Sequence, residues 1–279
     1  MTHGTLYVVA TPIGNLGDMT ERARTVLGSA HAIFAEDTRQ TRKLLDLLGI
    51  SAPPLFAMHE HSSAGAIENA LTRLRLGENI ALVSDAGTPL VSDPGAPLVR
   101  AARTEGHAVR PVPGASAVIA ALSATALGDG RFRFLAFLPR EGPERRDAIA
   151  LCADTEETVV LYEAPHRLTS TLRDLADAMG AREAVIVREI TKLHEEHLSG
   201  TLAELATIER DWLGEVVLVL APWNAKAREG EVTDEALDAR IDALYSKGER
   251  AKRISELLSA WCGRPKRELY ERVVSRKPR

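Results

Sequence analysis

The first 115 residues alternate short apolar runs with longer amphipathic stretches. Short apolar runs bounded by turn residues predict buried strands, and stretches with apolar residues three or four positions apart predict helices. The predicted strands span residues 6–11, 32–35, 54–58, 80–84 and 109–112. The predicted helices span residues 20–27, 38–48, 63–75 and 96–103. Strands that alternate with helices favour parallel pairing, so this region predicts a doubly wound parallel sheet.

A second α/β pattern follows, in which some strands alternate polar with apolar residues and several connections are short. These two features predict a mixed sheet. The predicted strands span residues 131–138, 158–162, 184–188, 197–201 and 215–221, and the predicted helices span residues 143–152, 165–179 and 202–209. The fold class is therefore α/β, with two α/β domains.

The C-terminal part has a different pattern. Residues 222–231 are typical of a linker, and three amphipathic helices are predicted after it, over residues 234–245, 250–261 and 266–274. The last two flank the turn Gly263-Arg264-Pro265, which is typical of a helix-turn-helix shape. We therefore expect three regions: an α/β domain over 1–116, a second α/β domain over 117–224 and a basic helical region over 225–279.

Charge distinguishes the C-terminal region from the rest of the chain. Residues 247–279 contain eleven Lys and Arg against four Glu, a net charge of +7, whereas the whole chain carries −4. The remaining residues therefore carry −11. A basic segment on an acidic protein is typical of contact with nucleic-acid phosphates, although a solvated helical surface has a similar composition.

The composition argues against several classes of protein. No apolar stretch reaches 18 residues and the first residues lack a signal-peptide pattern, so we expect a cytoplasmic protein with no membrane contact. The two cysteines, Cys152 and Cys262, predict neither a disulfide framework nor a zinc site.

One loop is rich in the residues that bind ligands. The apolar run 80–83 leads directly into Ser84-Asp85-Ala86-Gly87-Thr88-Pro89, which is followed by Asp93-Pro94-Gly95. Glycine allows a ligand to approach the backbone, and proline fixes the shape of the loop. Open α/β sheets bind ligands at the carboxyl ends of their strands, so this loop is a candidate site.

Two further loops are predicted at the same edge of the sheet. Thr11-Pro12-Ile13-Gly14-Asn15-Leu16-Gly17-Asp18 follows the first strand, and Pro113-Gly114-Ala115-Ser116 follows the last. The first lacks the G-x-G-x-x-G pattern and the lysine of a P-loop, so dinucleotide and nucleoside triphosphate binding lose support.

Charged residues follow other predicted strands. Glu36-Asp37-Thr38-Arg39-Gln40-Thr41 could grip a ribose or a phosphate, or its acids could serve the start of a helix. Tyr162-Glu163-Ala164-Pro165-His166-Arg167 and the segment 188–197 add polar groups in the second domain. Neither His194-Glu195-Glu196-His197 nor His59-Glu60-His61 has the ligands of a metal site, so no metal is expected.

The motifs in these segments, taken in order, resemble the small-subunit ribosomal RNA methyltransferase I family of the tetrapyrrole methylase superfamily (class III methyltransferases). The resemblance covers residues 6–221 and also includes Arg188-Glu189-Ile190-Thr191-Lys192-Leu193-His194-Glu195-Glu196. Ala115 stands where the family commonly has proline. Beyond residue 222 the match is weaker, although basic C-terminal helices also occur in the family.

The resemblance implies two α/β domains with S-adenosylmethionine bound in the cleft between them. It implies methylation of the ribose 2′-oxygen of a decoding-centre cytidine in small-subunit 16S rRNA, within the small ribosomal subunit, by a homodimer. The expected cofactor-binding residues are those of the ligand loops with one aromatic residue: Pro12, Gly14, Asn15, Asp85, Ala86, Gly87, Thr88, Pro113, Gly114, Ser116 and Tyr162.

The catalytic candidates are Glu163, Lys192, Arg39 and Glu189. We favour Glu163 as proton acceptor, with Lys192 or Arg39 holding the ribose or its phosphate. The alternative to a catalytic role is that Glu163 forms a local ion pair with Arg167, four residues on. Two other functions stay open: a methyltransferase for a tetrapyrrole or precorrin-type small molecule, against which the basic tail argues, and a non-catalytic ribosome-associated RNA-binding protein, against which the ligand loops argue.

Overall fold

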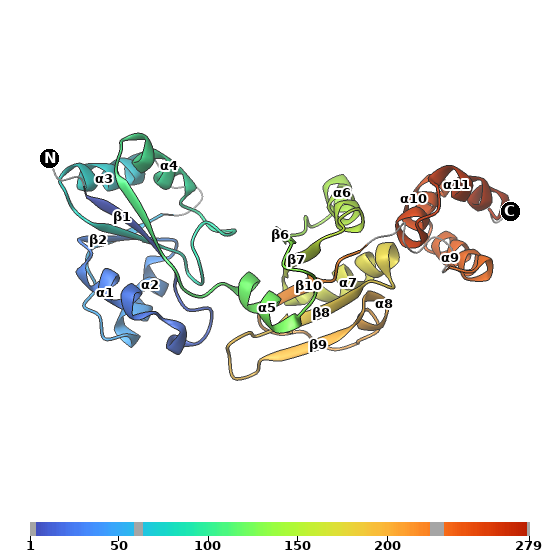
Figure 1. Cartoon of the computed structure of the whole chain (residues 1–279), viewed down its shortest axis with the longest axis horizontal. Helices are drawn as coiled ribbons and strands as arrows, with labels where there is room; N and C mark the ends of the chain where they lie inside the picture. The colour runs from blue at the N-terminus through green and yellow to red at the C-terminus, as the bar shows by residue number, and fades with distance from the viewer. Residues whose placement is uncertain (1–3, 59–63, 224–231, 278–279) are drawn as a thin grey trace. The chain divides into compact units, whose positions relative to one another are not determined.

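The computed structural model describes residues 4–58, 64–223 and 232–277 (Figure 1). The chain divides into two units. One comprises Met1–Ala120 with Ile190–Leu193, and the other comprises Ala121–Glu189 with His194–Arg279. The finer division into three regions remains a prediction.

The first unit is built on a five-stranded parallel sheet. Its strands are β1 (Thr5–Val9), β2 (Ala32–Ala35), β3 (Leu55–Ala57), β4 (Ile80–Val83) and β5 (Ala108–Val112), in the order β3-β2-β4-β1-β5. Every neighbouring pair runs parallel. The predicted parallel sheet is therefore confirmed, and all five strands present their carboxyl ends at one edge.

Helices cover both faces of this sheet. On one face, α1 (Glu21–Ser29) and α2 (Thr38–Leu47) share a core with strand residues such as Val9 and Ile33. On the other, α3 (Ala64–Arg75) and α4 (Ala96–Thr104) share a core with neighbours such as Leu6 and Phe34. Successive strand residues alternate between the two cores because side chains of a strand point to opposite faces. Both faces are apolar, which explains why the strands appear as continuous apolar runs.

Two helical segments of this region were not predicted. A short 3₁₀ helix, η1, covers Leu16–Asp18, and α5 covers Ala117–Thr125. The sequence of α5, AVIAALSAT, is apolar almost throughout and therefore lacks the amphipathic period by which helices are recognised. In η1 the Asn15 side chain accepts a hydrogen bond from the Gly17 amide at 2.9 Å, which makes Asn15 the N-cap.

The second unit is built on a mixed sheet, as predicted. It comprises β6 (Phe132–Phe137), β7 (Thr158–Glu163), β8 (Glu183–Arg188), β9 (Glu196–Thr201) and β10 (Val216–Leu220), in the order β6-β7-β10-β8-β9. The β6–β7 pair is parallel and the other pairs are antiparallel. Its helices are α6 (Gly142–Ala153), α7 (Pro165–Met179) and the short α8 (Leu202–Leu205). Every residue of the central strand β10 is buried.

Three C-terminal helices belong to the same hydrophobic core as this sheet. They are α9 (Asp234–Ser246), α10 (Ala251–Cys262) and α11 (Lys266–Ser275). Leu258 and Leu269 are fully buried in that core. Gly263 ends α10 in the left-handed conformation, with φ 76°, and Pro265 precedes α11, so the predicted turn is present. Residues 224–231 of the predicted linker lie outside the described residues.

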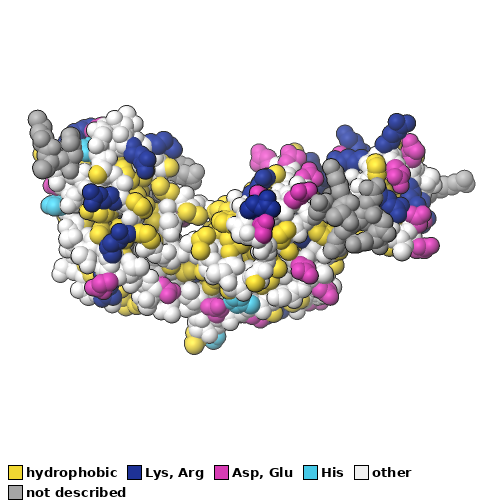
Figure 2. Space-filling view, viewed as in Figure 1, with side chains coloured by type: hydrophobic (Ala, Val, Ile, Leu, Met, Phe, Trp, Pro, Cys, Tyr) yellow, Lys and Arg dark blue, Asp and Glu magenta, His cyan; other side chains and the backbone are white. Residues whose placement is uncertain are grey.

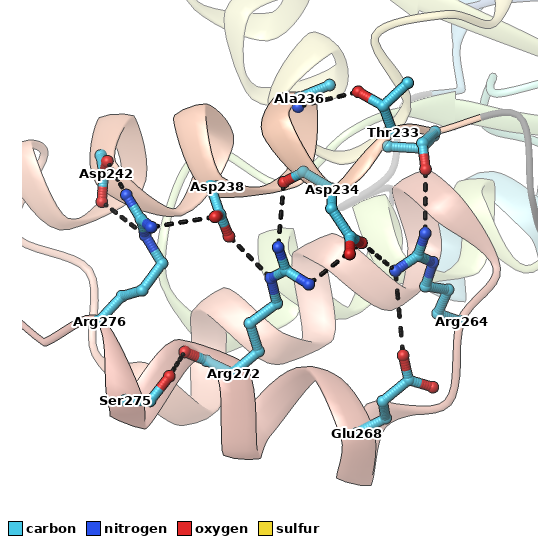
Figure 3. Close-up of polar contacts among 11 residues, drawn as sticks. Thr233, Asp234, Ala236, Asp238, Asp242, Arg264, Glu268, Arg272, Ser275 and Arg276 are labelled. Atoms are coloured by element: carbon cyan, nitrogen blue, oxygen red, sulfur yellow. Dashed lines mark hydrogen bonds and ion pairs between the residues drawn. The ribbon is translucent and has the colours of Figure 1, made fainter.

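A ladder of ion pairs joins α11 and its preceding turn to α9 (Figure 3). Arg264 contacts Asp234 at 2.8 Å, and Arg272 reaches Asp238 at 2.7 Å. The aspartates recur four residues apart, as do Arg272 and Arg276, so each Asp faces an Arg across the helix pair. The last contacts of the ladder are Arg272 to Asp234 at 3.0 Å, Arg276 to Asp238 at 3.0 Å and Arg276 to Asp242 at 2.6 Å. Accordingly, cationic and anionic side chains lie intermingled over these helices in Figure 2.

Within the described ranges, no helix has both the length and the apolar character needed to cross a bilayer.

Candidate active site

Two of the predicted ligand loops are hydrogen-bonded to each other at the carboxyl edge of the parallel sheet. The Thr11 amide donates to the Gly87 carbonyl at 2.9 Å, and the Gly87 amide donates to the Thr11 carbonyl at 3.1 Å. The Thr11 hydroxyl also donates to the Ser84 carbonyl at 3.3 Å. The loop after β1 and the loop after β4 are therefore fixed against each other, with Thr11 and Ser84 buried.

The third loop joins the other two. The Thr88 hydroxyl donates to the Ala115 carbonyl at 3.0 Å. A Cβ atom at Gly114 would lie 2.9 Å from the Ala10 Cβ, so only glycine allows the loops after β1 and β5 to come this close. The sequence analysis predicted that these three loops meet, and the structure brings them together.

Gly87 lies at the centre of this arrangement. Its φ of 78° is in the left-handed region, and a Cβ atom there would lie 3.2 Å from Ile13 Cγ2. The same loop continues through Leu90 and Ser92, each with φ 72°, and Gly95 with φ 115°. Left-handed backbone at two non-glycine residues is strained and is held by surrounding contacts, a pattern that is frequent at ligand sites.

Four carboxylates gather at the same edge. The Asp37 amide donates to Asp85 Oδ1 at 3.0 Å, and the Asp85 amide donates to Glu36 Oε2 at 3.4 Å. Burial raises the pKa of Asp85. Burial also raises the pKa of Asp93 to about 6, against a hydrogen bond from Ser84 and with a further contribution from the charges of Glu36 and Asp85. This edge therefore concentrates negative charge, which favours a cationic ligand.

Arg39 lies at the start of α2 beside this cluster. Its guanidinium forms a forked contact with Asp37, with Nε 3.1 Å from Oδ1 and Nη2 2.7 Å from Oδ2. The hydrogen bonds from the side chain and amide of Arg39 lower the pKa of Asp37 to about 2. The Asp37 side chain also caps α2 by accepting from the Arg39 amide at 2.8 Å. The helix-start alternative for this motif is therefore confirmed, and the binding of a ribose or a phosphate stays a prediction.

Lys192 lies against the first ligand loop. It belongs to the segment Ile190–Leu193, which clusters with the first unit although it connects β8 to β9. A Cβ atom at Gly14 would lie 2.5 Å from Lys192 Cγ and 2.8 Å from Cε, so the aliphatic stem of Lys192 crosses directly over Gly14. The structure thus places two candidate residues, one catalytic and one cofactor-binding, in contact, although they are far apart in the sequence.

Glu163 is buried in the second unit, with only 2% of its surface exposed. Its Oε2 accepts from the Thr171 hydroxyl at 2.5 Å, and its Oε1 accepts from the Ala164 amide at 2.8 Å. Arg167 Nε lies 3.4 Å from Oε1, so the ion pair considered from the sequence is present. Both carboxylate oxygens are therefore engaged by neighbours.

The surroundings of Glu163 hold the end of β6. Arg167 donates to the Leu138 carbonyl at 2.7 Å, and Arg145 donates to the Pro139 carbonyl at 2.9 Å. Arg145 also donates to the Thr171 hydroxyl at 3.0 Å, which links the network back to Glu163. Sequence reasoning missed Arg145, because one of two adjacent arginines in a predicted helix gives no signal of such a role.

Two other candidate residues lie at ends of strands in this unit. The Tyr162 ring packs against Phe134 and Phe137, with ring centroids 4.9 and 5.6 Å away. Glu189 has a left-handed φ of 53°, and its Oε1 accepts from the Glu215 amide at 2.9 Å. Tyr162 therefore belongs to an aromatic cluster at the β6–β7 pair, and Glu189 is held at the start of β10.

Asp93 is a further candidate that the sequence analysis did not single out. The motif Asp93-Pro94-Gly95 was noted, but the chain alone did not show that its carboxylate returns to the Asp85 loop. Among the described residues, no group of three or more His, Cys, Asp or Glu side chains could hold a metal ion, and His59-Glu60-His61 lies outside those residues.

Comparison with known proteins agrees with these features. The sequence profile of the tetrapyrrole (corrin/porphyrin) methylases matches residues 5–206. A protein of Xylella fastidiosa called ribosomal RNA small subunit methyltransferase I is 45% identical over 274 residues, which cover 96% of this chain and 98% of that protein. A protein of the same name from Pseudomonas aeruginosa is 42% identical over 285 residues, which cover 99% of each chain.

Solved structures with the same fold are more distant in sequence. Uroporphyrin III C-methyltransferase from Thermus thermophilus superposes with a TM-score of 0.56 at 18% identity and covers 78% of this chain and 97% of that one. A diphthine synthase gives a TM-score of 0.57 at 16% identity, covering 78% of this chain and 89% of that one. These likenesses establish the fold, while the full-length relatives establish the group: the chain belongs to the tetrapyrrole methylase family and, within it, to the small-subunit ribosomal RNA methyltransferases I.

Proposed function

We propose that this protein transfers a methyl group from S-adenosylmethionine to the ribose 2′-oxygen of a cytidine in the decoding centre of small-subunit 16S rRNA. The observation that carries the proposal is 41–45% identity, over nearly the whole chain, to relatives named as small-subunit rRNA methyltransferases. The ligand loops and the acidic edge of the parallel sheet supply the chemistry that such an enzyme needs.

S-adenosylmethionine would bind at the three joined loops. Its sulfonium is a cation, and the carboxylates of Asp85 and Asp93 lie at this edge. The neighbouring Asp85 and Ala86 are exposed, so a ligand can approach the backbone of this loop there, while Gly87 is fixed by its hydrogen bonds to Thr11. The proposed cofactor-binding residues are Pro12, Gly14, Asn15, Asp85, Ala86, Gly87, Thr88, Pro113, Gly114, Ser116 and Tyr162.

The reaction requires a proton to leave the attacking hydroxyl. The ribose oxygen forms a bond to the methyl carbon, the carbon–sulfur bond breaks with its electron pair moving to sulfur, and the 2′-hydroxyl proton passes to an acceptor. A positioned base or a polarising cation lowers the barrier to this step. Lys192, whose stem crosses Gly14, is suited to hold the ribose oxygen, and Arg39 is suited to hold a phosphate. Glu163 and Glu189 are the proposed carboxylate candidates.

The role of Glu163 can be tested against the structural role that its contacts suggest. As proton acceptor, its replacement in Glu163→Gln should lower the single-turnover rate by about a hundredfold or more. The measurement is methyl transfer at saturating cofactor and subunits, with the exposed Glu144→Gln as control and thermal unfolding of each variant in parallel. A rate within about threefold of wild type, with or without reduced stability, would assign Glu163 to anchoring Arg167 and move the proposal to Glu189 and Lys192.

The function itself is tested with labelled S-adenosylmethionine and purified small ribosomal subunits. Label should enter the 16S rRNA, and the labelled position should resist alkaline cleavage of the following phosphodiester, because a methylated 2′-oxygen cannot attack it. Label in a base, or in a tetrapyrrole instead of RNA, would replace this proposal by another methyl acceptor. RNA binding without transfer would favour the non-catalytic alternative.

Assembly and location are further parts of the proposal. We expect a cytoplasmic homodimer that acts on the small ribosomal subunit. Light scattering of the purified protein would measure its mass in solution, and a mass equal to one chain at assay concentration would remove the dimer from the proposal.

A further inference from the structure

The outward face of α2 carries a shallow, open hollow beside the acidic edge. The inward face of this helix packs on the sheet, with Thr41 and Leu45 buried. The residues that line the hollow, of about 510 Å³, are Thr38, Arg39, Arg42, Lys43, Asp46 and Leu47. From Arg39 onward they recur at helical spacing, so they share one face of α2.

This face has an excess of positive charge. Arg39, Arg42 and Lys43 oppose one lining carboxylate, Asp46. Arg39 is engaged by Asp37. In the part of the chain that the structure describes, neither Arg42 nor Lys43 forms an ion pair. Two cations that are available to a ligand thus lie on a protein whose net charge is −4.

The hollow also offers an apolar contact. Leu47 is a large hydrophobic residue with 59% of its surface exposed at the far end of the same face. A nucleotide combines an anionic phosphate with apolar ring and sugar surfaces, so it matches both parts of the hollow. Arginine binds phosphate through its planar fork, and lysine binds it as a point charge.

The position of α2 relates this hollow to the proposed chemistry. The helix is capped by Asp37, and the Asp37 amide donates to Asp85 in the proposed cofactor loop. A strand of RNA on the outward face of α2 would therefore pass close to the cofactor edge of the same unit. The local cations would also offset the repulsion between RNA phosphates and the carboxylates at that edge.

We propose that the outward face of α2, through Arg42 and Lys43, binds the phosphodiester backbone of single-stranded substrate RNA next to the nucleotide that receives the methyl group. This inference rests on the proposed function, because it takes RNA as the methyl acceptor. It adds a binding surface in the first unit, whose residues are not those of the basic C-terminal region.

The test is the double variant Arg42→Ala/Lys43→Ala in the full-length protein. The matched control is Arg100→Ala/Arg103→Ala, because these two exposed cations lie three residues apart on α4, on the opposite face of the same sheet. Both double substitutions lie within helices, and each removes two positive charges. The measurements are the affinity for a short fluorescein-labelled single-stranded RNA as a function of salt, the KM for small ribosomal subunits, and the affinity for S-adenosylmethionine.

The α2 variant should bind the RNA at least about tenfold more weakly at low salt. Its salt slope should fall by about 1.4, since each phosphate contact with single-stranded RNA contributes about 0.7. The KM for subunits should rise, and the affinity for S-adenosylmethionine should stay at the wild-type value, while the control variant keeps the wild-type RNA affinity and slope.

Equal RNA affinity and equal KM in the α2 variant and the control would overturn the inference while leaving the methyl transfer of the wild-type protein intact. A wild-type protein that transfers no methyl group to RNA would instead overturn the proposed function. An equal loss in both variants would show that only net charge matters, which also contradicts a specific surface on α2.

Discussion

At the scale of single residues, Arg182 carries the most unusual contacts. It is fully buried, and it is the largest such side chain among the described residues. Its guanidinium donates to the carbonyls of Ala221 at 2.6 Å, Cys152 at 2.7 Å and Glu157 at 3.1 Å. Burial lowers its pKa to about 10, so it remains cationic at neutral pH. One side chain thus joins the end of α6, the segment before β7 and the end of β10.

Arg182→Met should strongly destabilise the second unit. Methionine keeps an apolar stem of similar length but removes the guanidinium hydrogen bonds to three carbonyls, at a cost of about 3 kcal/mol. All three tryptophans, Trp212, Trp223 and Trp261, lie in this unit, so tryptophan fluorescence during urea unfolding reports on it. The exposed Arg173→Met on α7 is the control. An unfolding midpoint equal to that of the control would show that these hydrogen bonds contribute little.

Asp93 leads to a prediction about pH. Its pKa of about 6 lies above the ordinary value, so in the folded protein this carboxyl becomes ionised only as the pH rises through 6. Ionisation adds negative charge beside the proposed sulfonium site. The affinity for S-adenosylmethionine should therefore fall as the pH is lowered from 7 to 5, by about fivefold if the charge contributes about 1 kcal/mol.

Asp93→Asn should bind more weakly at pH 7 and lose most of this dependence, whereas the exposed Asp211→Asn should keep it. Calorimetric titrations at both pH values make the comparison. A wild-type affinity that does not change between pH 5 and 7 would separate Asp93 from the cofactor site. For folding, the sign is opposite: the raised pKa stabilises the folded state at low pH, and this contribution is lost as the pH rises through 6.

At the scale of elements, the loop after β4 depends on the backbone of Gly87. Gly87→Val introduces a branched side chain at φ 78°, towards Ile13 and the space where the cofactor would approach. We expect the affinity for S-adenosylmethionine to fall at least about tenfold, measured by calorimetry.

Gly106→Val separates this effect from backbone strain. Gly106 has the same φ of 78°, but it precedes β5 at the opposite edge of the sheet, and a Cβ atom there meets nothing within 4 Å. The two variants should be destabilised by comparable amounts, yet only Gly87→Val should lose cofactor affinity. Unchanged affinity in a folded Gly87→Val protein would exclude this loop from the cofactor site.

At the scale of the whole molecule, the basic residues of the C-terminal region fall into two groups: those paired with aspartates of α9 and those exposed to solvent. Arg264, Arg272 and Arg276 are committed to the ladder with α9, and hydrogen bonds to those arginines lower the pKa of Asp234 and Asp238. Other cations, such as Lys266 and Lys277, are exposed. Deleting the region would remove Leu258 and Leu269 from the second core and expose the residues that pack against them, so deletion is not a clean test of RNA binding.

Substitutions can test the exposed cations and the paired arginines separately. Lys266→Ala/Arg267→Ala/Lys277→Ala should weaken RNA binding and reduce its salt slope by up to about 2, without changing thermal unfolding or cofactor affinity. Arg272→Ala should instead reduce the stability of the second unit, because it breaks contacts to two aspartates. If the triple variant binds small subunits with the wild-type salt slope, the C-terminal cations serve only as a solvated surface.

The sequence by itself determined the class of the fold and the location of the ligand loops. Apolar runs alternating with helices specify a parallel sheet, and parallel strands necessarily bring the segments after β1, β4 and β5 to one edge. The mixed sheet was also predictable, from its alternating strands and short connections. These features follow from local periodicity and turn chemistry, which act over a few residues.

Only the tertiary structure decided which charged side chains form pairs and which are buried. Arg272 and Asp238 are 34 residues apart, and Lys192 and Gly14 are farther apart still, so no local period relates them. The burial of Arg182 and the occupied oxygens of Glu163 likewise depend on packing between distant elements. The physical reason is that a charged side chain is defined by its environment, and that environment is formed by segments that meet only when the chain folds.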